Sequence, residues 1–398
     1  MAQKFADYEQ AFMNRAIALA RRARGRVEPN PMVGCVLARG RRMIAEGYHR
    51  RFGGPHAEID ALRRAADDAR GATAYVTLEP CCHTGKTPPC TDALIEAGLS
   101  RVVVAMKDPF AQVAGRGLRQ LRRAGIRVDV GLCHKEAQEL NAPYLTLVGQ
   151  HRPYVILKWA QSIDGKIATH TGDSQWISGP ESRRLAHRLR ARVDAILIGI
   201  GTVLADDPLL TARDVPIRRT ATRIILDTNL RLPLTCQLVA TAGVPHPSQS
   251  EGWGTDALRT KAWTTDHPPV LLLTSRAALR KRPRHAQRLQ QRGVEIIPCR
   301  VKNGRIDLTA ALRLLGDRQM TNLMVEGGGR TLAAFLDARL ADEAHIFIAP
   351  KLIGGQSAIQ AYPGQGAPQI ADAFVTGVIE TRRSGPDTLM RLRLMTNR

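Results

Sequence analysis

Residues 78–90 of the chain read Leu78-Glu79-Pro80-Cys81-Cys82-His83-Thr84-Gly85-Lys86-Thr87-Pro88-Pro89-Cys90. The segment follows an apolar stretch over 72–78 that predicts a strand. It leads into a short helix predicted over 91–97, which Gly98 closes. Its cysteines therefore stand where a strand ends and a helix begins, positions at which side chains from separate elements can converge on one ligand.

A third candidate ligand, His56, precedes a helix predicted over 58–70. One imidazole and two thiols, from His56, Cys81 and Cys90, form a ligand set suited to Zn²⁺, and a catalytic zinc keeps its fourth position for water. His56 and Cys90 lie at predicted helix N-termini, where the helix dipole favours a thiolate. We therefore expect a zinc site.

Glu58 lies two residues after His56, so it can reach a water on the metal without being a ligand. Zinc lowers the pKa of its water to about 7, and the resulting hydroxide would attack an amidine-like ring carbon. Glu58 would take the water proton and pass protons to the ring nitrogen and to departing ammonia. This ordered arrangement is that of zinc nucleobase deaminases.

The neighbours of Cys81 leave two alternatives open. Cys82 could supply the first thiolate, but Cys81 is preferred because it directly follows Pro80. His83 could be a ligand, and the interpretation we favour is that it contacts substrate or fixes the loop. Cys82 then needs no role.

The chain of 398 residues carries a net charge of +22, which raises the question of nucleic-acid binding. The arginines are scattered along most of the chain, and aromatic residues make up only 4%, too few for a base-stacking platform. A basic surface and phosphorylated ligands explain the charge better. We expect no nucleic-acid partner.

Seven cysteines, an odd number, argue against a disulfide framework and for reduced thiols. No apolar run approaches the roughly 20 residues that span a bilayer. The first seven residues lack the apolar core of a signal peptide. We therefore expect no membrane partner and a cytoplasmic location.

Helix and strand patterns alternate along the first 150 residues, which predicts a mostly parallel sheet covered by helices on both faces. The pattern resets near 141–153, and a second α/β unit follows. The predicted domains are 1–148 and 149–398, with 241–268, rich in Pro, Ser, Gly, Thr and His, as an exposed insertion. Further elements are expected as helices over 8–24, 118–123, 181–191, 276–292, 308–315 and 331–339, and strands over 32–38, 101–106, 126–130, 154–159, 194–200, 223–227, 270–274, 294–298, 322–326 and 343–349.

Two glycine-rich stretches occur in the second half. Gly199-Ile200-Gly201-Thr202-Val203-Leu204 is a partial dinucleotide-binding fingerprint whose third glycine is missing, which alone indicates only a tight turn. Val325-Glu326-Gly327-Gly328-Gly329-Arg330-Thr331 follows an apolar strand and opens a helix, so its backbone could cradle a pyrophosphate. The alternative is a strand-to-helix turn without a ligand.

The segment 78–90 closely resembles the deaminase half of the bifunctional deaminase/reductases of riboflavin biosynthesis, although that family typically has Ser at the position of Cys82 and often Arg at that of Lys86. The stretches 30–34, 47–50 and 53–55 match the family too. The resemblance continues through Lys158, 162–166, 174–178, 201–213, the turn over 325–329 and 349–355. It spans nearly the whole chain except 241–268.

The resemblance implies an α/β protein of two domains. The N-terminal domain would be cytidine-deaminase-like, with three α/β/α layers, and the C-terminal domain would be a dihydrofolate-reductase-like α/β fold. The first would deaminate 2,5-diamino-6-ribosylamino-4(3H)-pyrimidinone 5′-phosphate with zinc. The second would reduce the ribosyl group to ribityl with NADPH, giving 5-amino-6-(5-phosphoribitylamino)uracil. A homo-oligomer is favoured.

The resemblance also implies site residues. Asn30 and His49 would line the pyrimidine pocket, unless they are only a turn and a surface histidine. Lys158 and Asp206 would orient or protonate the ribose carbonyl, unless they form a surface salt bridge. The expected NADPH contacts are Ala160, Trp176, Thr202, Asp206, Thr228, Gly327, Gly328, Gly329, Arg330 and Thr331. The expected substrate contacts of the second domain are Ser174, Arg190, Leu210, Arg213 and Glu326, with Arg190 and Arg213 on the phosphate.

Two other functions remain open. A tRNA-type base deaminase with an accessory domain would need no NADPH and would bind RNA in a salt-sensitive way. A zinc-stabilised scaffold without activity would unfold on loss of the metal.

Overall fold

The computed structural model describes residues 5–84, 88–242 and 268–394. Contacts divide the chain into two compact units, Met1–His151 and Arg152–Arg398. The boundary predicted at 148/149 falls inside helix α6 (Ala142–Gln150), which ends immediately before this division. Most of the predicted insertion over 241–268 lies outside the described residues.

The first unit is built on a five-stranded sheet in the order β2-β1-β3-β4-β5. Its strands are β1 (Gly34–Arg39), β2 (Arg42–Tyr48), β3 (Thr73–Val76), β4 (Arg101–Val104) and β5 (Arg127–Val130). β3, β4 and β5 are parallel, but β1 pairs antiparallel with both β2 and β3. Four of the five strands of this sheet therefore run in the same direction, and the expectation of a mostly parallel sheet fails at β1, which runs against them. β2 was missed because its first two residues are exposed and only Ala45 and Gly47 are buried, so it shows no clear apolar alternation.

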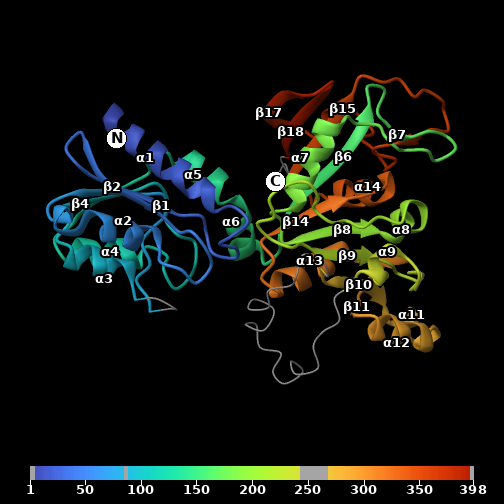
Figure 1. Ribbon diagram of the computed structural model, residues 1–398, viewed down its shortest axis with the longest axis horizontal. Helices are drawn as coiled ribbons and strands as arrows, with labels where there is room; N and C mark the ends of the chain where they lie inside the picture. Colours follow the sequence, from blue (N-terminus) through green and yellow to red (C-terminus); the bar gives the residue numbers. More distant parts are fainter. Residues whose placement is uncertain (1–4, 85–87, 243–267, 395–398) are drawn as a thin grey trace. The chain divides into compact units, whose positions relative to one another are not determined.

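Helices cover both faces of this sheet, as predicted (Figure 1). One face packs against α1 (Asp7–Ala20), α5 (His134–Leu140) and α6, and the other against α2 (Ala57–Ala65), α3 (Cys90–Glu96) and α4 (Arg116–Arg123). Single 3-10 turns, η1 (Arg21–Ala23) and η2 (Ala66–Ala69), follow α1 and α2. The first unit thus has three layers.

Gly47 of β2 sets the distance between the sheet and α2. A Cβ atom there would lie 2.4 Å from the backbone nitrogen of Ala61 and 2.5 Å from the carbonyl oxygen of Ala57. Only glycine permits this approach. The contact holds the first turn of α2, and with it His56 and Glu58, against the edge of the sheet.

The second unit contains a nine-stranded sheet in the order β11-β10-β9-β8-β14-β6-β15-β18-β17 (Figure 1). Its strands are β6 (Tyr154–Ser162), β8 (Ala195–Gly199), β9 (Thr222–Leu226), β10 (Val270–Ser275), β11 (Val294–Cys299), β14 (Asn322–Glu326), β15 (Glu343–Ala349), β17 (Thr376–Ser384) and β18 (Asp387–Leu394). The strands from β11 to β15 are parallel, whereas β18 and β17 are antiparallel additions at the edge. Consecutive residues such as Leu197 and Ile198 point to opposite faces of the sheet, and both are buried, so both faces are covered.

The helices of this unit lie mostly between successive strands. They are α7 (Pro180–Arg190), α8 (Ile200–Asp206), α9 (Gln237–Ala240), α11 (Arg276–Lys281), α12 (Pro283–Gln291), α13 (Leu308–Asp317), α14 (Gly329–Asp337) and the 3-10 turn η4 (Ile370–Asp372). Two small ladders pair β7 (Lys166–Ala168) with β16 (Ile359–Gln360), and β12 (Val301–Lys302) with β13 (Arg305–Ile306). The single helix predicted over 276–292 was wrong: Pro283 forces Arg282 out of helical geometry and divides it in two.

Arg223 of β9 is fully buried and holds together the segments that precede and follow residues 243–267. Its guanidinium donates hydrogen bonds to the hydroxyl and carbonyl oxygens of Thr241 (2.7 and 2.8 Å) and to the carbonyl oxygen of Pro268 (2.7 Å). One side chain of the sheet therefore fixes both segments.

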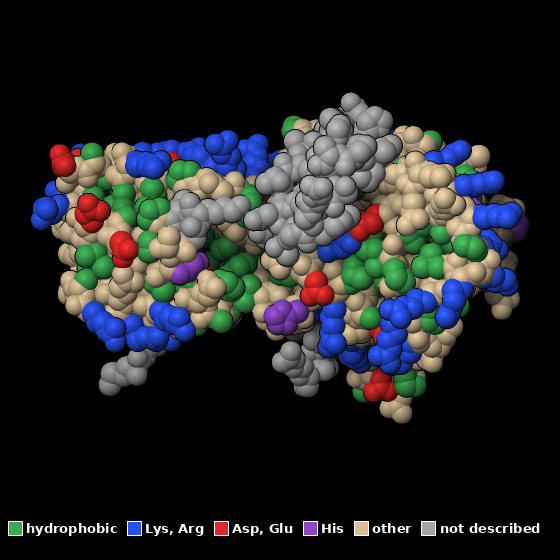
Figure 2. All heavy atoms as spheres, turned by 90° about the horizontal axis from the view of Figure 1, so that it is seen from below, with side chains coloured by type: hydrophobic (Ala, Val, Ile, Leu, Met, Phe, Trp, Pro, Cys, Tyr) green, Lys and Arg blue, Asp and Glu red, His purple; other side chains and the backbone are tan. Residues whose placement is uncertain are grey.

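The surface carries the chain's positive charge in several separate groups over both units on the face shown in Figure 2. Among the described residues, no helix is long and apolar enough to cross a membrane.

Candidate active sites

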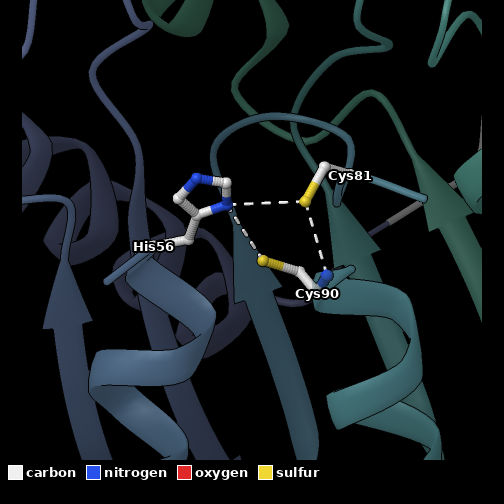
Figure 3. A group of neighbouring side chains, drawn as sticks. All are labelled: His56, Cys81 and Cys90. Carbon is white, nitrogen blue, oxygen red and sulfur yellow. Dashed lines mark hydrogen bonds between the residues drawn. The ribbon is translucent and has the colours of Figure 1, made fainter. Parts of the chain in front are cut away.

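His56, Cys81 and Cys90 come together in the first unit (Figure 3). His56 caps α2, Cys90 opens α3, and Cys81 lies in the loop after β3. His56 Nδ1 lies 3.2 Å from Cys90 Sγ and 3.4 Å from Cys81 Sγ, and the Cys90 backbone N–H donates to Cys81 Sγ at 3.4 Å. The three predicted ligands thus converge from three elements.

This arrangement fits zinc. Zinc bonds of about 2.0–2.3 Å in a tetrahedron place nitrogen and sulfur ligands about 3.5–3.8 Å apart. The three donor atoms lie within 4.8 Å of one another, so only small movements would close them on an ion. A hydrogen bond with Cys90, aided by His56, lowers the pKa of Cys81 to about 4. A thiolate, the form that binds metals, is therefore stable here.

Glu58 lies in the first turn of α2, with its side chain 3% exposed. Burial raises its pKa to about 7. A carboxyl group of this kind, beside His56 and Cys90 but outside the ligand set, can both accept and return a proton near neutral pH.

His49 and Asn30, the predicted pyrimidine contacts, lie beside the metal ligands. The His49 ring is 5.3 Å from the His56 ring, and its Nδ1 lies 2.9 Å from the carbonyl oxygen of Pro55. That carbonyl can only accept, so Nδ1 carries the proton and Nε2 accepts from Asn30 Nδ2 at 3.3 Å. Burial lowers the pKa of His49 and keeps it neutral. The other alternative, a surface histidine, does not fit this buried position.

Glu79 had no role in the sequence analysis, yet it organises the loop beside the metal site. Its buried carboxylate accepts hydrogen bonds from the backbone N–H groups of Asp108 (3.2 Å), Gly115 (3.0 Å) and Leu118 (3.3 Å). A Cβ on Gly117 would come 2.3 Å from the carbonyl oxygen of Pro80, directly before Cys81. These contacts therefore fix the position of Cys81 relative to residues 108–118.

Cys82 and His83 lie outside the ligand triad. Cys82 Sγ is directed at the carbonyl oxygen of Gln112, 3.8 Å away. His83 Nδ1 is buried without a hydrogen-bond partner, and its ring lies 6.1 Å from that of Phe110. The arrangement favours Cys81 as the first thiolate and leaves His83 available to a ligand.

The second unit opens into a cavity of about 2050 Å³. It lies where β6, β8, β9 and β14 end, the usual ligand position in a parallel sheet. Every residue of the second domain that was predicted to contact substrate or cofactor lines it. They are Lys158, Ala160, Ser174, Trp176, Arg190, Thr202, Asp206, Leu210, Arg213, Thr228, Glu326, Gly327, Gly328, Gly329, Arg330 and Thr331.

Glu326 and Arg190 form a buried ion pair in the wall of this cavity. Arg190 donates through Nε and a terminal nitrogen to the two carboxylate oxygens, at 2.6 and 2.7 Å. Burial opposes ionisation of Glu326, but the Arg190 charge outweighs it and holds the pKa at about 2. Because both carboxylate oxygens occupy its guanidinium fork, Arg190 is less free to grip a phosphate than Arg213, which is exposed.

Lys158 lies beside Glu326 in the register of β6 and β14. Burial lowers its pKa, and the Glu326 charge partly offsets this. Among the described residues Lys158 forms no ion pair with Asp206, so the surface salt bridge considered from the sequence does not exist. The Lys158 amine therefore interacts electrostatically with the Glu326 carboxylate and not with Asp206.

The glycine-rich turn joins β14 to α14. The Gly328 N–H donates to Thr202 Oγ1 of α8 at 3.1 Å, so the two glycine-rich stretches meet at one wall. A Cβ on Gly329 would lie 2.4 Å from the carbonyl oxygen of Gln360. Trp176 is 60% exposed at the cavity, with the Arg183 guanidinium 4.7 Å from its ring centre.

Two family models match the chain. Residues 6–106 match the cytidine and deoxycytidylate deaminase zinc-binding region, and residues 153–384, more than half of the chain, match the RibD C-terminal domain. The chain belongs to the RibD family of riboflavin biosynthesis proteins.

Curated RibD proteins match along almost the whole chain. That of Escherichia coli is 40% identical over 387 residues, covering 96% of this chain and 99% of the relative. That of Aquifex aeolicus is 42% identical over 348 residues, covering 87% and 88%.

Solved RibD structures share the fold. Acinetobacter baumannii RibD superposes with a TM-score of 0.81 at 34% identity, covering 98% of this chain and 99% of that one. The diaminohydroxyphosphoribosylaminopyrimidine deaminase/5-amino-6-(5-phosphoribosylamino)uracil reductase of Thermotoga maritima superposes with a TM-score of 0.77 at 35% identity, with the same coverage. The fold class predicted for both domains is confirmed. The chain is a bifunctional enzyme of riboflavin biosynthesis, with a zinc-dependent deaminase unit and an NADPH-dependent reductase unit.

Proposed function

We propose that the two units act in turn on one phosphorylated pyrimidine. The first hydrolyses the 2-amino group of 2,5-diamino-6-ribosylamino-4(3H)-pyrimidinone 5′-phosphate, releasing ammonia. The second then reduces the ribosyl group to ribityl. The observation that carries the proposal is that one chain combines the His56, Cys81 and Cys90 triad, beside Glu58, with a cavity walled by Lys158 and Glu326.

In the deaminase unit, zinc bound by the triad would polarise the attacking water. Glu58 accepts the proton of that water and delivers protons to the ring nitrogen and the leaving amino group. Asn30 donates to His49, which leaves its carboxamide oxygen to accept from the pyrimidine. His49, held as the Nδ1–H form by Pro55, is fixed in orientation and does not compete for the proton.

In the reductase unit, NADPH would supply the hydride to C1′ of the ribosyl group. Ring opening leaves a hydroxyl at the former ring oxygen, and the reaction consumes one proton overall. Lys158, poised beside Glu326, is the proposed donor of that proton or the group that orients the opened sugar. Arg213, exposed at the same cavity, is the proposed contact of the substrate phosphate, and Arg190 holds Glu326.

We also propose that the enzyme works in the cytoplasm as a homo-oligomer, without nucleic acid. Thiol ligands and an NADPH-dependent reaction suit a reducing compartment. The arginines are scattered along the chain, which suits phosphorylated ligands more than one extended polyanion.

The test is to follow ammonia release and NADPH oxidation with the diamino-pyrimidine ribosyl phosphate, for the wild type and Glu58→Gln. Wild type should perform both reactions. The variant should keep its zinc but lose about 10²–10⁴-fold in deamination, the usual contribution of a general acid–base. It should still oxidise NADPH at the wild-type rate when given the deaminated intermediate.

Three results would contradict the proposal. A folded, zinc-loaded wild type that performs neither reaction would do so, and salt-sensitive deamination of RNA would then point to a base deaminase. Zinc loss that unfolds a protein inactive on every substrate would indicate a scaffold. A Glu58→Gln variant with full deaminase activity would remove Glu58 from the mechanism.

A further inference from the structure

A short hairpin carries two positive charges into the wall of the reductase cavity. β12 and β13 are joined by Asn303 and Gly304, whose φ angles are 51° and 73°. Positive φ at both central residues defines a type I′ turn, for which Asn-Gly is a preferred sequence. Such a two-residue turn fixes the register, and Lys302 lies directly opposite Arg305.

Directly opposed residues of an antiparallel pair project from the same face, where like charges repel each other. Both side chains are exposed and line the cavity. Neither the Lys302 nor the Arg305 side chain has a hydrogen bond or ion pair with any residue of the described ranges. An anion bound between them would turn this unfavourable pair into a favourable one.

The hairpin is attached firmly to the cofactor wall. Ile306, which is buried, donates its N–H to Thr228 Oγ1 at 3.3 Å. Asp307 donates its N–H to the carbonyl oxygen of Arg300 at 2.9 Å, and its side chain caps α13. The two cations therefore project from a fixed position and not from a free loop.

The strand order locates this hairpin along a bound dinucleotide. Lys158 and Glu326 mark the reacting end at β6 and β14, and the glycine-rich turn with Thr202 offers N–H groups to the pyrophosphate. From there the cavity continues past β8 to Thr228, at the end of β9. β9 lies three strands from β6, or about 14 Å. The adenosine ribose would thus lie beside Thr228 and the hairpin.

We propose that Lys302 and Arg305 bind the 2′-phosphate of the NADPH adenosine and give the reductase its preference for NADPH over NADH. The proposal rests on the NADPH-dependent reductase activity. Arg231, exposed at the same part of the cavity, adds a third positive charge.

The experiment measures dissociation constants of the full-length enzyme by calorimetry for NADPH, NADH, 2′,5′-ADP and 5′-AMP. The variant is Lys302→Gln with Arg305→Gln, and the control is Arg300→Gln. Arg300 has a side chain 77% exposed, pairs at 3.8 Å with Asp307 and does not line the cavity. The double variant should bind NADPH and 2′,5′-ADP about 10–100-fold more weakly, the value of a charged hydrogen bond. The dissociation constants of NADH and 5′-AMP should change less than about twofold in the double variant. Those of all four ligands should change less than about twofold in Arg300→Gln.

A measurement on the wild type guards against misfolding of the variant. Its preference for 2′,5′-ADP over 5′-AMP should decrease as salt is raised, since two fixed cations make the extra contact. A salt-independent preference would overturn the proposal, as would equal losses for NADPH and NADH or an effect of Arg300→Gln equal to that of the double variant.

The dissociation constant of ribose 5-phosphate distinguishes a site for the substrate phosphate from a site for the 2′-phosphate of NADPH. If the double variant weakens ribose 5-phosphate and spares 2′,5′-ADP, the hairpin holds the substrate phosphate and the proposal is wrong. If the inference holds, the double variant needs more NADPH but still reduces the deaminated intermediate, whereas a folded wild type that oxidises no NADPH with that intermediate would contradict the proposed function instead.

Discussion

The two active sites differ in how far apart along the chain their residues lie. His56 and Cys90, which meet in the deaminase site, are 34 residues apart, whereas Arg190 and Glu326 of the reductase site are 136 apart. The first site is built from two helix starts and one loop of a small sheet. The second depends on the register of strands and helices across a much larger unit. A local site can be recognised as a motif, but a dispersed one requires the fold.

The largest effect should come from removing one ligand of the local site. Cys90→Ser should abolish zinc binding and lower deamination by more than about 10³-fold, because the activation of water by zinc is lost. Reduction of the deaminated intermediate should be unchanged. Metal content by mass spectrometry and the two separate assays check this.

Wild type stripped with a chelator is the control, and zinc should restore it but not Cys90→Ser. A Cys90→Ser variant that retains one zinc per chain would contradict the prediction, since His56, Cys81 and Cys90 would not then be the ligand set.

The next effect concerns the dispersed site. Arg190→Met leaves Glu326 buried without its partner and should lower the free energy of unfolding of the second unit by about 3–5 kcal/mol. Reductase activity should fall while deaminase activity persists. Denaturant unfolding and both assays measure this. Arg190→Met combined with Glu326→Leu should recover only part of the stability, because Lys158 then lacks the Glu326 charge, and should not recover reduction.

The pH dependence of stability gives an independent check on the same pair. Arg190 holds the folded-state pKa of Glu326 at about 2, below the ordinary value of 4.5. The pair therefore contributes stability above pH 4.5, which is lost as the pH falls towards 2. Glu326→Gln should make stability less dependent on pH in this window, and an unchanged profile would contradict the ion pair.

The smallest effect should come from Cys82→Ser. Its thiol is directed at Gln112 and not at the triad, so zinc content and deamination should change less than about twofold. Cys81→Ser is the matched control and should lose the metal. The reverse result would assign the first thiolate to Cys82.

The sequence allowed the His56, Cys81 and Cys90 triad and Glu58 to be predicted because each stands at the start of a helix or in the loop after a strand. It did not reveal the role of Glu79, because the carboxylate accepts hydrogen bonds from backbone N–H groups of Asp108, Gly115 and Leu118, and backbone donors leave no side-chain pattern in the sequence. Resemblance to the family predicted the reductase contacts, and the structure places all of them on the wall of one cavity. The resemblance did not show that Arg190 is paired with Glu326, since that contact depends on long-range packing.

Several of the missed strands share a physical cause. β2 and β17 lie at sheet edges and β12 in a two-stranded ladder, where few side chains are buried and the apolar alternation that marks a strand is weak. The same weakness concealed the β12–β13 hairpin. Its Asn-Gly pair is a recognised hairpin signal, but the flanking strands of two residues each were too short to support it.

The buried Arg223 has a consequence for how this protein tolerates changes in length. Because one guanidinium nitrogen binds the carbonyl oxygens of both Thr241 and Pro268, the chain leaves the reductase unit and re-enters it at a single point. Insertions are tolerated best where the two flanking residues lie close together and stay bonded to the fold, because the inserted segment then does not strain the sheet. A reporter or affinity module inserted between Thr241 and Pro268 should therefore leave β9 and its neighbouring strands intact, provided that both of these residues are kept.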